Sequence, residues 1–435
     1  MIRLRAVRER LRLSLWFLPA VFALAAVGLA VLLAAVDQRL EDAGSLFFTF
    51  GGTAEGARAV LSAIAQSMLT FTGLVFTITM LVLQLASSQL SPRVMRTFLR
   101  DRANQIVLGL FVATFVYTLL VLAEVRTPVD GDHGFVPAIS IWVAFALLLA
   151  SVGAFIYYID HMAHAIRAST VIASIWRETV AAVDRLFPEG LGNEPHEDLP
   201  WPDLQQPDIV LKAPHAGVLV GVDEEQLLAA AASGDRALAL VPAVGDFVAE
   251  GSPLAHLWGS WDGDAVNAVL GATSQGEERT LDQDAAFGLR QLVDIALRAL
   301  SPGTNDPTTA VQALDRIHDL LRRLAMRRFP SRVRVVDGRV RMLLDAPVWD
   351  DFVHLGLDEI RLAGGSQIQV TRRLRAILDD LATVAPGARQ SVLSDEIAAL
   401  VADAERGFRN GRDRAEAAEP SARGHALGSG TRSRS

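Results

Sequence analysis

The stretch that decides the fold is residues 13–36, which read LSLWFLPAVFALAAVGLAVLLAAV and contain no charged side chain. A helix rises about 1.5 Å per residue, so this stretch would be about 36 Å long and would exceed the roughly 30 Å hydrocarbon core of a bilayer. A secretory signal peptide has a shorter apolar region and a small-residue cleavage site. We therefore interpret residues 13–36 as a retained membrane span.

Three further stretches of similar length also lack charged side chains, namely residues 59–92, 103–123 and 135–159. Each is long enough to cross a bilayer as a helix. The sequence therefore predicts a membrane domain over residues 1–160, with spans at about 13–36, 60–88, 104–123 and 136–159.

The placement of arginine predicts which side of the membrane each loop occupies, because short cytoplasmic flanks carry an excess of basic residues. Arginines gather before the first span and between the second and third spans: Arg3, Arg5, Arg8, Arg10, Arg12, Arg93, Arg96, Arg100 and Arg102. We expect both regions, and therefore both termini, to be cytoplasmic in a plasma (inner) membrane.

The composition excludes several classes of function. The 435 residues include 41 basic and 49 acidic side chains, for a net charge of −8, so nucleic-acid binding has no electrostatic support. There is no cysteine, which excludes disulfides, thiol nucleophiles and thiolate metal sites. Lys212 is the only lysine, and we expect no cofactor.

The second span differs from the others because its polar residues share one helical face. This polar stripe consists of Ser62, Gln66, Thr70, Gly73, Thr77, Gln84 and Ser88. Glutamine is costly in hydrocarbon, so the stripe should face protein or water. One interpretation is helix packing. The other is a pore lined by copies of this helix, with Met80 or Leu81 as an apolar constriction.

Residues 161–207 are expected to continue the fourth helix to about residue 183 and then to form a linker rich in Gly, Pro and acidic residues. Asp160, His161 and His164 lie where that helix leaves the membrane. They could hold a metal ion or sense pH, but interfacial solvation or packing is the favoured explanation, so no metal site is predicted from them.

Residues 208–260 alternate short apolar runs with turns, which predicts a small β module. The segments APHAG (213–217) and VGDFVAEGSPL (244–254) resemble turns of barrel-sandwich-hybrid modules. In biotinyl and lipoyl carriers the modified lysine lies in a hairpin tip between such halves. Lys212 precedes the first element instead, so the resemblance implies a structural module without a prosthetic group.

Residues 261–409 read as a mainly helical cytosolic domain, which gives the cytosolic region an α+β character. Helices are expected at 277–300, 349–363, 367–383 and 390–408, with a hairpin at 333–344 around Asp337-Gly338. Residues 410–435 are rich in Gly, Ser, Ala and Arg and are expected to be disordered.

A helix stop followed by a helix cap accounts for the residues of the segment SPGTNDPTT (301–309). The exposed amides of a helix start could also hold an anion or a partner. The candidate residues for that anion or interface site are Arg290, Asp294, Arg298, Asn305, Asp306, Thr308 and Thr309.

Three motifs carry a resemblance to a known family: QLASSQLSPR (84–93), NQIVLGLF (104–111) and RQLVDIALRALSPGTNDP (290–307). With them, nearly the whole chain resembles the bacterial predicted membrane proteins that carry domain of unknown function 2254 (DUF2254). The resemblance implies membrane topology and supplies no assigned activity or catalytic residues.

Three functions follow from these patterns. The first is a homo-oligomeric pore- or transport-related protein with a cytosolic assembly or gating domain. The alternative is a non-conducting membrane scaffold or sensor that binds a cytosolic ligand or partner. A membrane-bound metal-dependent enzyme has the least support, because the sequence lacks Gly-x-Ser-x-Gly, phosphate-loop and His-Glu-x-x-His motifs. No catalytic residue is predicted.

Overall fold

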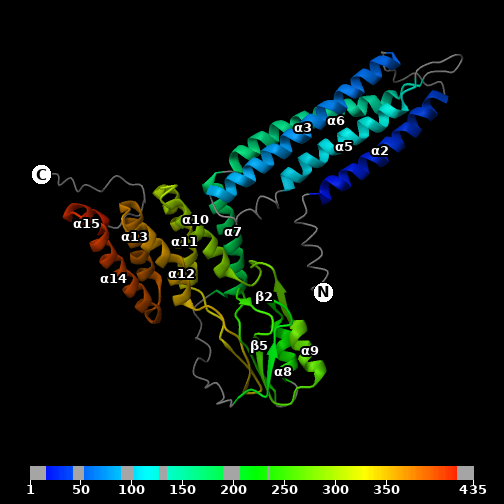
Figure 1. The fold of residues 1–435 in the computed structure, drawn as a ribbon. Coiled ribbons are helices and arrows are strands. Elements are labelled where there is room, and N and C mark those ends of the chain that lie inside the picture. Colours follow the sequence, from blue (N-terminus) through cyan, green and yellow to red (C-terminus); the bar gives the residue numbers. More distant parts are fainter. Residues whose placement is uncertain are drawn as a thin grey trace. The chain divides into compact units, whose positions relative to one another are not determined.

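The computed structural model describes residues 16–42, 53–89, 102–126, 135–165, 167–189, 206–232 and 236–418. The chain forms two compact units, Met1–Thr170 and Val171–Ser435 (Figure 1). The first unit contains four long apolar helices. The second is a mixed α/β region with two small sheets.

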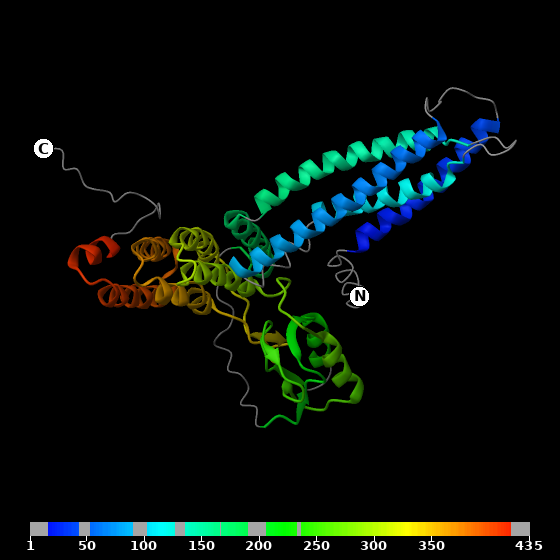
Figure 2. The ribbon, with the colours of Figure 1, turned by 45° about the horizontal axis from the view of Figure 1, so that its top comes forward.

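The first unit consists of α2 (Phe17–Asp42), α3 (Ala54–Gln89), α5 (Arg102–Glu124) and α6 (Ala138–Ala165). All four are long and apolar enough to cross a membrane, so the prediction of four long apolar helices is confirmed and each is a candidate span. They run alongside one another, with α5 packed against the other three (Figure 2). The packed interior includes Leu61 and Met68 of α3, Tyr117 of α5 and Ile141 of α6.

A carboxylate from one helix caps another in this unit. Asp37 of α2 is buried, and its two oxygens accept hydrogen bonds from the backbone amides of Ile139 and Ser140, each at 3.0 Å. The Ser140 hydroxyl donates to the same carboxylate at 2.6 Å. These groups lie in the first turn of α6, where amides lack partners within the helix, so Asp37 supplies the cap.

The expected continuation of the fourth helix to residue 183 is wrong. Helix α6 ends at Ala165, and a separate helix, α7 (Ala168–Leu186), begins after the break. Helix α7 is amphipathic and buries Val171, Ile172 and Ile175 in the second unit. Packing within the second unit therefore holds α7.

The helical part of the second unit is formed by α7, α10 (Ala285–Leu300), α11 (Pro307–Ala325), α12 (Trp349–Gly364), α13 (Ile368–Val384), the 3-10 turn Gly387–Arg389, α14 (Gln390–Gly407) and α15 (Gly411–Ala418). Gly288 of α10 lies directly against the buried Thr179 of α7, where a Cβ atom would overlap the threonine side chain. This close approach joins the two helices.

Two expectations in this region need correction. The helix expected from residue 277 begins only at Ala285, because the buried Asp284 accepts the Phe287 amide at 3.0 Å and ends the preceding turn as an N-cap. The tail expected to be disordered from 410 starts with α15, whose Ala417 is buried beside Phe408. Residues 419–435 lie outside the described residues.

Two small sheets complete the second unit. The larger has the order β1 (Ile209–Lys212), β5 (Pro253–Trp258), β3 (Ala237–Leu240), β8 (Arg339–Leu343) and β7 (Val333–Val336). The smaller has the order β4 (Phe247–Val248), β2 (Gly217–Val222) and β6 (Thr273–Gly276). Helices α8 (Glu224–Ala232) and α9 (Gly263–Ala272) contribute Leu227 and Val269 to the common apolar core.

The predicted hairpin is confirmed, and its position is informative. Asp337 and Gly338 both have positive φ, at 52° and 72°, as a two-residue type I′ turn requires. Strand β8 pairs in parallel with β3, whose residues are all buried. The hairpin therefore belongs to the same sheet as the β module, although the sequence placed it within the helical domain.

Candidate functional site

The polar stripe of the second span lies on the outer face of its helix. Helix α3 packs into the first unit through a face that includes Leu61, Met68 and Val75. The stripe residues whose side chains are described are all exposed: Ser62, Gln66, Thr70, Gly73, Thr77 and Gln84. The Ser88 side chain lies outside the described set. Because the stripe faces away from α2, α5 and α6, it does not pack the four helices of one chain together.

The stripe satisfies only part of its own hydrogen-bonding capacity. The Thr70 hydroxyl donates to the carbonyl of Gln66 at 3.0 Å, and the Thr77 hydroxyl donates to the carbonyl of Gly73 at 2.9 Å. Within the described residues, the side-chain amides of Gln66 and Gln84 have no hydrogen-bond partner. Each such amide in hydrocarbon costs several kcal/mol, roughly 2–7 by transfer measurements.

Apolar side chains border and interrupt the stripe. Met80 and Leu81, the residues predicted to form a constriction, are both exposed on α3. Gly73 leaves open space where a side chain would stand, because a Cβ atom there would meet nothing within 4 Å. The outer face of α3 thus offers a small residue for close approach between helices, together with two amides that need partners.

The residues at the end of the fourth span do not form a three-ligand group in the part of the chain that the structure describes. His164 Nδ1 lies 3.6 Å from the Asp160 carboxylate, and both side chains are exposed. His161 stacks instead on the Tyr157 ring, with 5.6 Å between ring centroids. This arrangement fits the interfacial interpretation.

The candidate anion residues fall into two sets of contacts. In α10, Arg290 pairs with Asp294 at 2.7 Å and also with Glu359 of α12. This contact joins the two helices and engages the guanidinium. Beside it in sequence, Arg298 and Thr308 lie at the end of α10 and in the first turn of α11.

The start of α11 is already occupied by a carboxylate from the chain itself. Asp306 accepts the Thr309 amide at 3.1 Å and the Thr309 hydroxyl at 2.6 Å. Asn305 has a φ of 46° and accepts a hydrogen bond from Gln367 at 3.3 Å. A negative side chain stands where an external anion would bind, so the geometry favours the cap.

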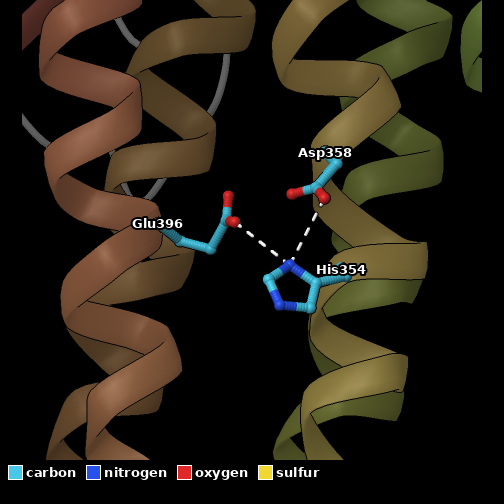
Figure 3. Close-up of side chains that lie close together, drawn as sticks. All are labelled: His354, Asp358 and Glu396. Atoms are coloured by element: carbon cyan, nitrogen blue, oxygen red, sulfur yellow. Dashed lines mark ion pairs between the residues drawn. The ribbon is translucent and has the colours of Figure 1, made fainter.

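A different cluster, which the sequence did not reveal, brings three metal-binding side chain types together. His354 and Asp358 stand one turn apart on α12, and Glu396 reaches them from α14 (Figure 3). His354 Nδ1 lies 3.3 Å from an oxygen of Asp358 and 3.3 Å from an oxygen of Glu396. Within the described residues, no other grouping of three such side chains has this proximity.

The surroundings of the cluster hold one of its carboxylates in place. The Glu396 side chain is only 6% exposed, and its second oxygen pairs with Arg361 at 3.3 Å. Arg361 pairs in turn with Asp403 of α14. Burial raises the pKa of Glu396 above its ordinary value, and the neighbouring Asp358 carboxyl raises it further. One Asp358 oxygen, Oδ1, is buried without a hydrogen bond.

Part of this signal was present in the sequence. A histidine and an aspartate four residues apart on a predicted helix, as at 354 and 358, share one face. Glu396 belongs to another helix, so only the packing of α12 against α14 shows that all three side chains meet.

The comparisons with known proteins relate the chain to predicted membrane proteins. The family model described as "Predicted membrane protein (DUF2254)" matches residues 12–380. The uncharacterised protein Rv1290c of Mycobacterium tuberculosis (strain H37Rv) is 35% identical over 426 residues, which cover 95% of this chain and 80% of that protein. The uncharacterised protein Mb1321c of Mycobacterium bovis has the same identity and coverage. No solved structure matches the chain.

Proposed function

The chain belongs to the DUF2254 family of predicted membrane proteins, and from that premise we propose that it is a homo-oligomeric, pore- or transport-related protein whose cytosolic unit assembles or gates it. The observation that carries the proposal is the exposed polar stripe of α3. In a single chain that stripe would face lipid.

Lipid cannot satisfy the stripe, but a second copy of the chain can. Hydrocarbon offers no hydrogen-bond partners, so the amides of Gln66 and Gln84 must face protein or water. Gly73 lets another helix approach closely. Most homo-oligomers are closed and symmetric, so copies of α3 would meet around an axis.

Such an assembly would define an aqueous path for ions or solutes and the constriction that narrows it. Gln66, Thr70 and Thr77 would line the interface or an aqueous path, and Met80 or Leu81 would narrow it as an apolar constriction. The arginine placement supports a plasma (inner) membrane location with both termini cytoplasmic. The second unit would then be cytosolic, and a barrel-sandwich form for its β region stays a prediction.

Cross-linking in native membranes tests the assembly directly, because the chain has no cysteine of its own. Thr70→Cys and Thr77→Cys should give disulfide-linked dimers on mild oxidation if the stripes of neighbouring chains meet. Leu149→Cys is the matched control, because Leu149 is 71% exposed on α6 and should face lipid. Equal cross-linking at all three positions, or none at the stripe, would refute the proposal.

Flux measurements separate a pore from the alternative of a non-conducting scaffold or sensor. We expect ion or solute flux in proteoliposomes, lowered by Gln66→Leu together with Gln84→Leu. The self-bonded hydroxyls of Thr70 and Thr77 favour the alternative, because they make the face less polar than its composition implies. Stripe-specific cross-links without flux would establish that alternative.

A further inference from the structure

We propose that His354, Asp358 and Glu396 form a binding site for a divalent transition-metal ion that joins α12 to α14. The inference concerns the second unit alone and does not depend on the proposed pore. It rests on the distances between the three ligand atoms, on the hydrogen-bonding capacity of those atoms, and on the charges around them.

The distances fit a shared metal ion. Two ligand atoms about 2.1 Å from one ion stand about 3.0 Å apart at a right angle and about 3.4 Å apart at the tetrahedral angle. His354 Nδ1 lies 3.3 Å from each carboxylate oxygen, and all three ligand atoms lie within 4.8 Å of one another. Only small side-chain movements would bring all three into coordination.

Hydrogen bonding within the cluster leaves acceptors unused. An imidazole Nδ1 carries at most one hydrogen, so it cannot donate fully to both Asp358 and Glu396. Asp358 Oδ2 is the oxygen that faces His354, while Oδ1 is buried without a hydrogen bond and lies 3.9 Å from the Arg361 guanidinium. A buried carboxylate oxygen without a donor is costly, and a metal ion bound by both oxygens of Asp358 would relieve that cost.

Arg361 provides the support that a metal ligand needs. It holds one oxygen of Glu396 at 3.3 Å. The other oxygen is directed at His354 (Figure 3). Asp403 in turn holds Arg361 and pairs with Arg406. Groups that hold a metal-binding side chain in this way orient it toward the ion, and they raise the affinity for the metal by about 10- to 100-fold.

Charge and ligand type define the class of ion. The network contains three carboxylates, on Asp358, Glu396 and Asp403, and two guanidinium groups, on Arg361 and Arg406. When these five groups are ionised their charges sum to −1, which attracts a cation. One nitrogen and two carboxylate oxygens suit Zn²⁺, Mn²⁺, Fe²⁺ or Co²⁺, whereas Ca²⁺ takes oxygen ligands alone.

Metal analysis of the full-length protein tests the site. Protein purified in detergent with a histidine-free tag is stripped with chelator and dialysed against Zn²⁺, Mn²⁺ or Co²⁺. We expect one ion per chain, and at least about tenfold weaker binding for His354→Ala and for the nearly isosteric Glu396→Gln. His164→Ala is the matched control, because His164 has an aspartate one turn away and, among the described residues, forms no group with a second carboxylate.

A second readout needs no variant. Hydrogen exchange in α12 and α14 of the wild-type protein should slow when the metal is added, because the ion would link the two helices. Substoichiometric binding, or binding that His354→Ala and Glu396→Gln leave unchanged, would mean adventitious surface metal only and would overturn the proposal. Stoichiometric binding without protection of these two helices would place the ion elsewhere and would also overturn it.

Discussion

Arg389 offers a quantitative test of how the helical part of the second unit is held together. Arg389 is 7% exposed, and its guanidinium donates to the carbonyls of Leu324, Ala325 and Arg327 at 3.1, 2.8 and 2.9 Å. These carbonyls lie at and just beyond the end of α11, where carbonyls lack partners within the helix, although the Leu324 carbonyl also accepts the Arg327 amide at 3.0 Å. The arginine thus caps α11 from a distant part of the chain.

We expect Arg389→Met to lower the free energy of unfolding by about 4 kcal/mol. The Ala325 and Arg327 carbonyls would each lose this donor in a buried place at roughly 1–3 kcal/mol, the Leu324 carbonyl would keep the Arg327 amide, and partial entry of water reduces the sum. The guanidinium also stands 4.8 Å from the Phe329 ring centre and 5.8 Å from that of Trp349, contacts worth about 0.5–1 kcal/mol each. The total free energy of unfolding of a domain is only about 5–15 kcal/mol, so this loss would be a large part of it.

Urea unfolding in detergent, followed by tryptophan fluorescence, measures this loss, because Trp349 lies beside the guanidinium. Arg409→Met is the control, since Arg409 is exposed and should change stability by no more than about 0.5 kcal/mol. Arg389→Lys should restore less than half of the lost free energy of unfolding, because one ammonium group cannot reproduce the forked N–H donors of a guanidinium. If Arg389→Met costs less than about 1 kcal/mol, water satisfies the carbonyls and the reasoning fails.

Three further substitutions test other contacts. Asp37→Ala should destabilise the first unit by about 0.5–2 kcal/mol through loss of the α6 cap, measured as earlier loss of helical signal in a denaturing-detergent titration, and Asp37→Asn should cost less. Gly288→Ala should cost about 1–3 kcal/mol by overpacking α7 against α10, whereas Gly303→Ala, which meets open space, should leave the thermal midpoint nearly unchanged. Burial lowers the pKa of His318 in the folded protein, so the unfolded chain binds the proton more readily. The free energy of unfolding should therefore fall as the pH drops below about 6.5. Urea titrations at several pH values should show a smaller fall for His318→Gln.

The contacts of His318 explain the sign of its pH effect. Arg373 donates to Nδ1 at 3.0 Å, so that nitrogen must be unprotonated, and Nε2 faces Asp380 at 2.8 Å. Arg322 also pairs with Asp380. Protonation of Nδ1 would break the Arg373 contact. An unchanged or steeper loss of stability at acidic pH in His318→Gln would contradict this account of His318. If Asp37→Ala or Gly288→Ala left stability unchanged, the corresponding account of the α6 cap or of the α7–α10 packing would be wrong.

Local features were predictable from the sequence where one physical cause dominates. Uncharged length alone predicts the four spans, and Asp337-Gly338 predicts the hairpin because few other dipeptides adopt two positive φ values cheaply. The start of α10 was predicted too early, because residues 277–284 are compatible with a helix and only the capping by Asp284 stops it.

Contacts between distant segments were not predictable in the same way. No local pattern shows that β8 adds to the edge of β3, or that Glu396 meets His354. The polar stripe of α3 is an intermediate case. Its periodicity gives the face, but only the buried side of α3, with Leu61 and Met68, shows that this face points away from the other spans.

The parallel pairing of β3 with β8 has a consequence for synthesis of the chain. A ribosome releases β3 well before residues 339–343 exist, so for that interval one side of a wholly apolar strand has backbone groups with no neighbour. Open strand edges of this kind recruit wrong partners. A nonsense mutation between β3 and β8 should therefore yield insoluble product rather than a shortened stable protein, and chaperones that shield nascent strands should matter most during this interval.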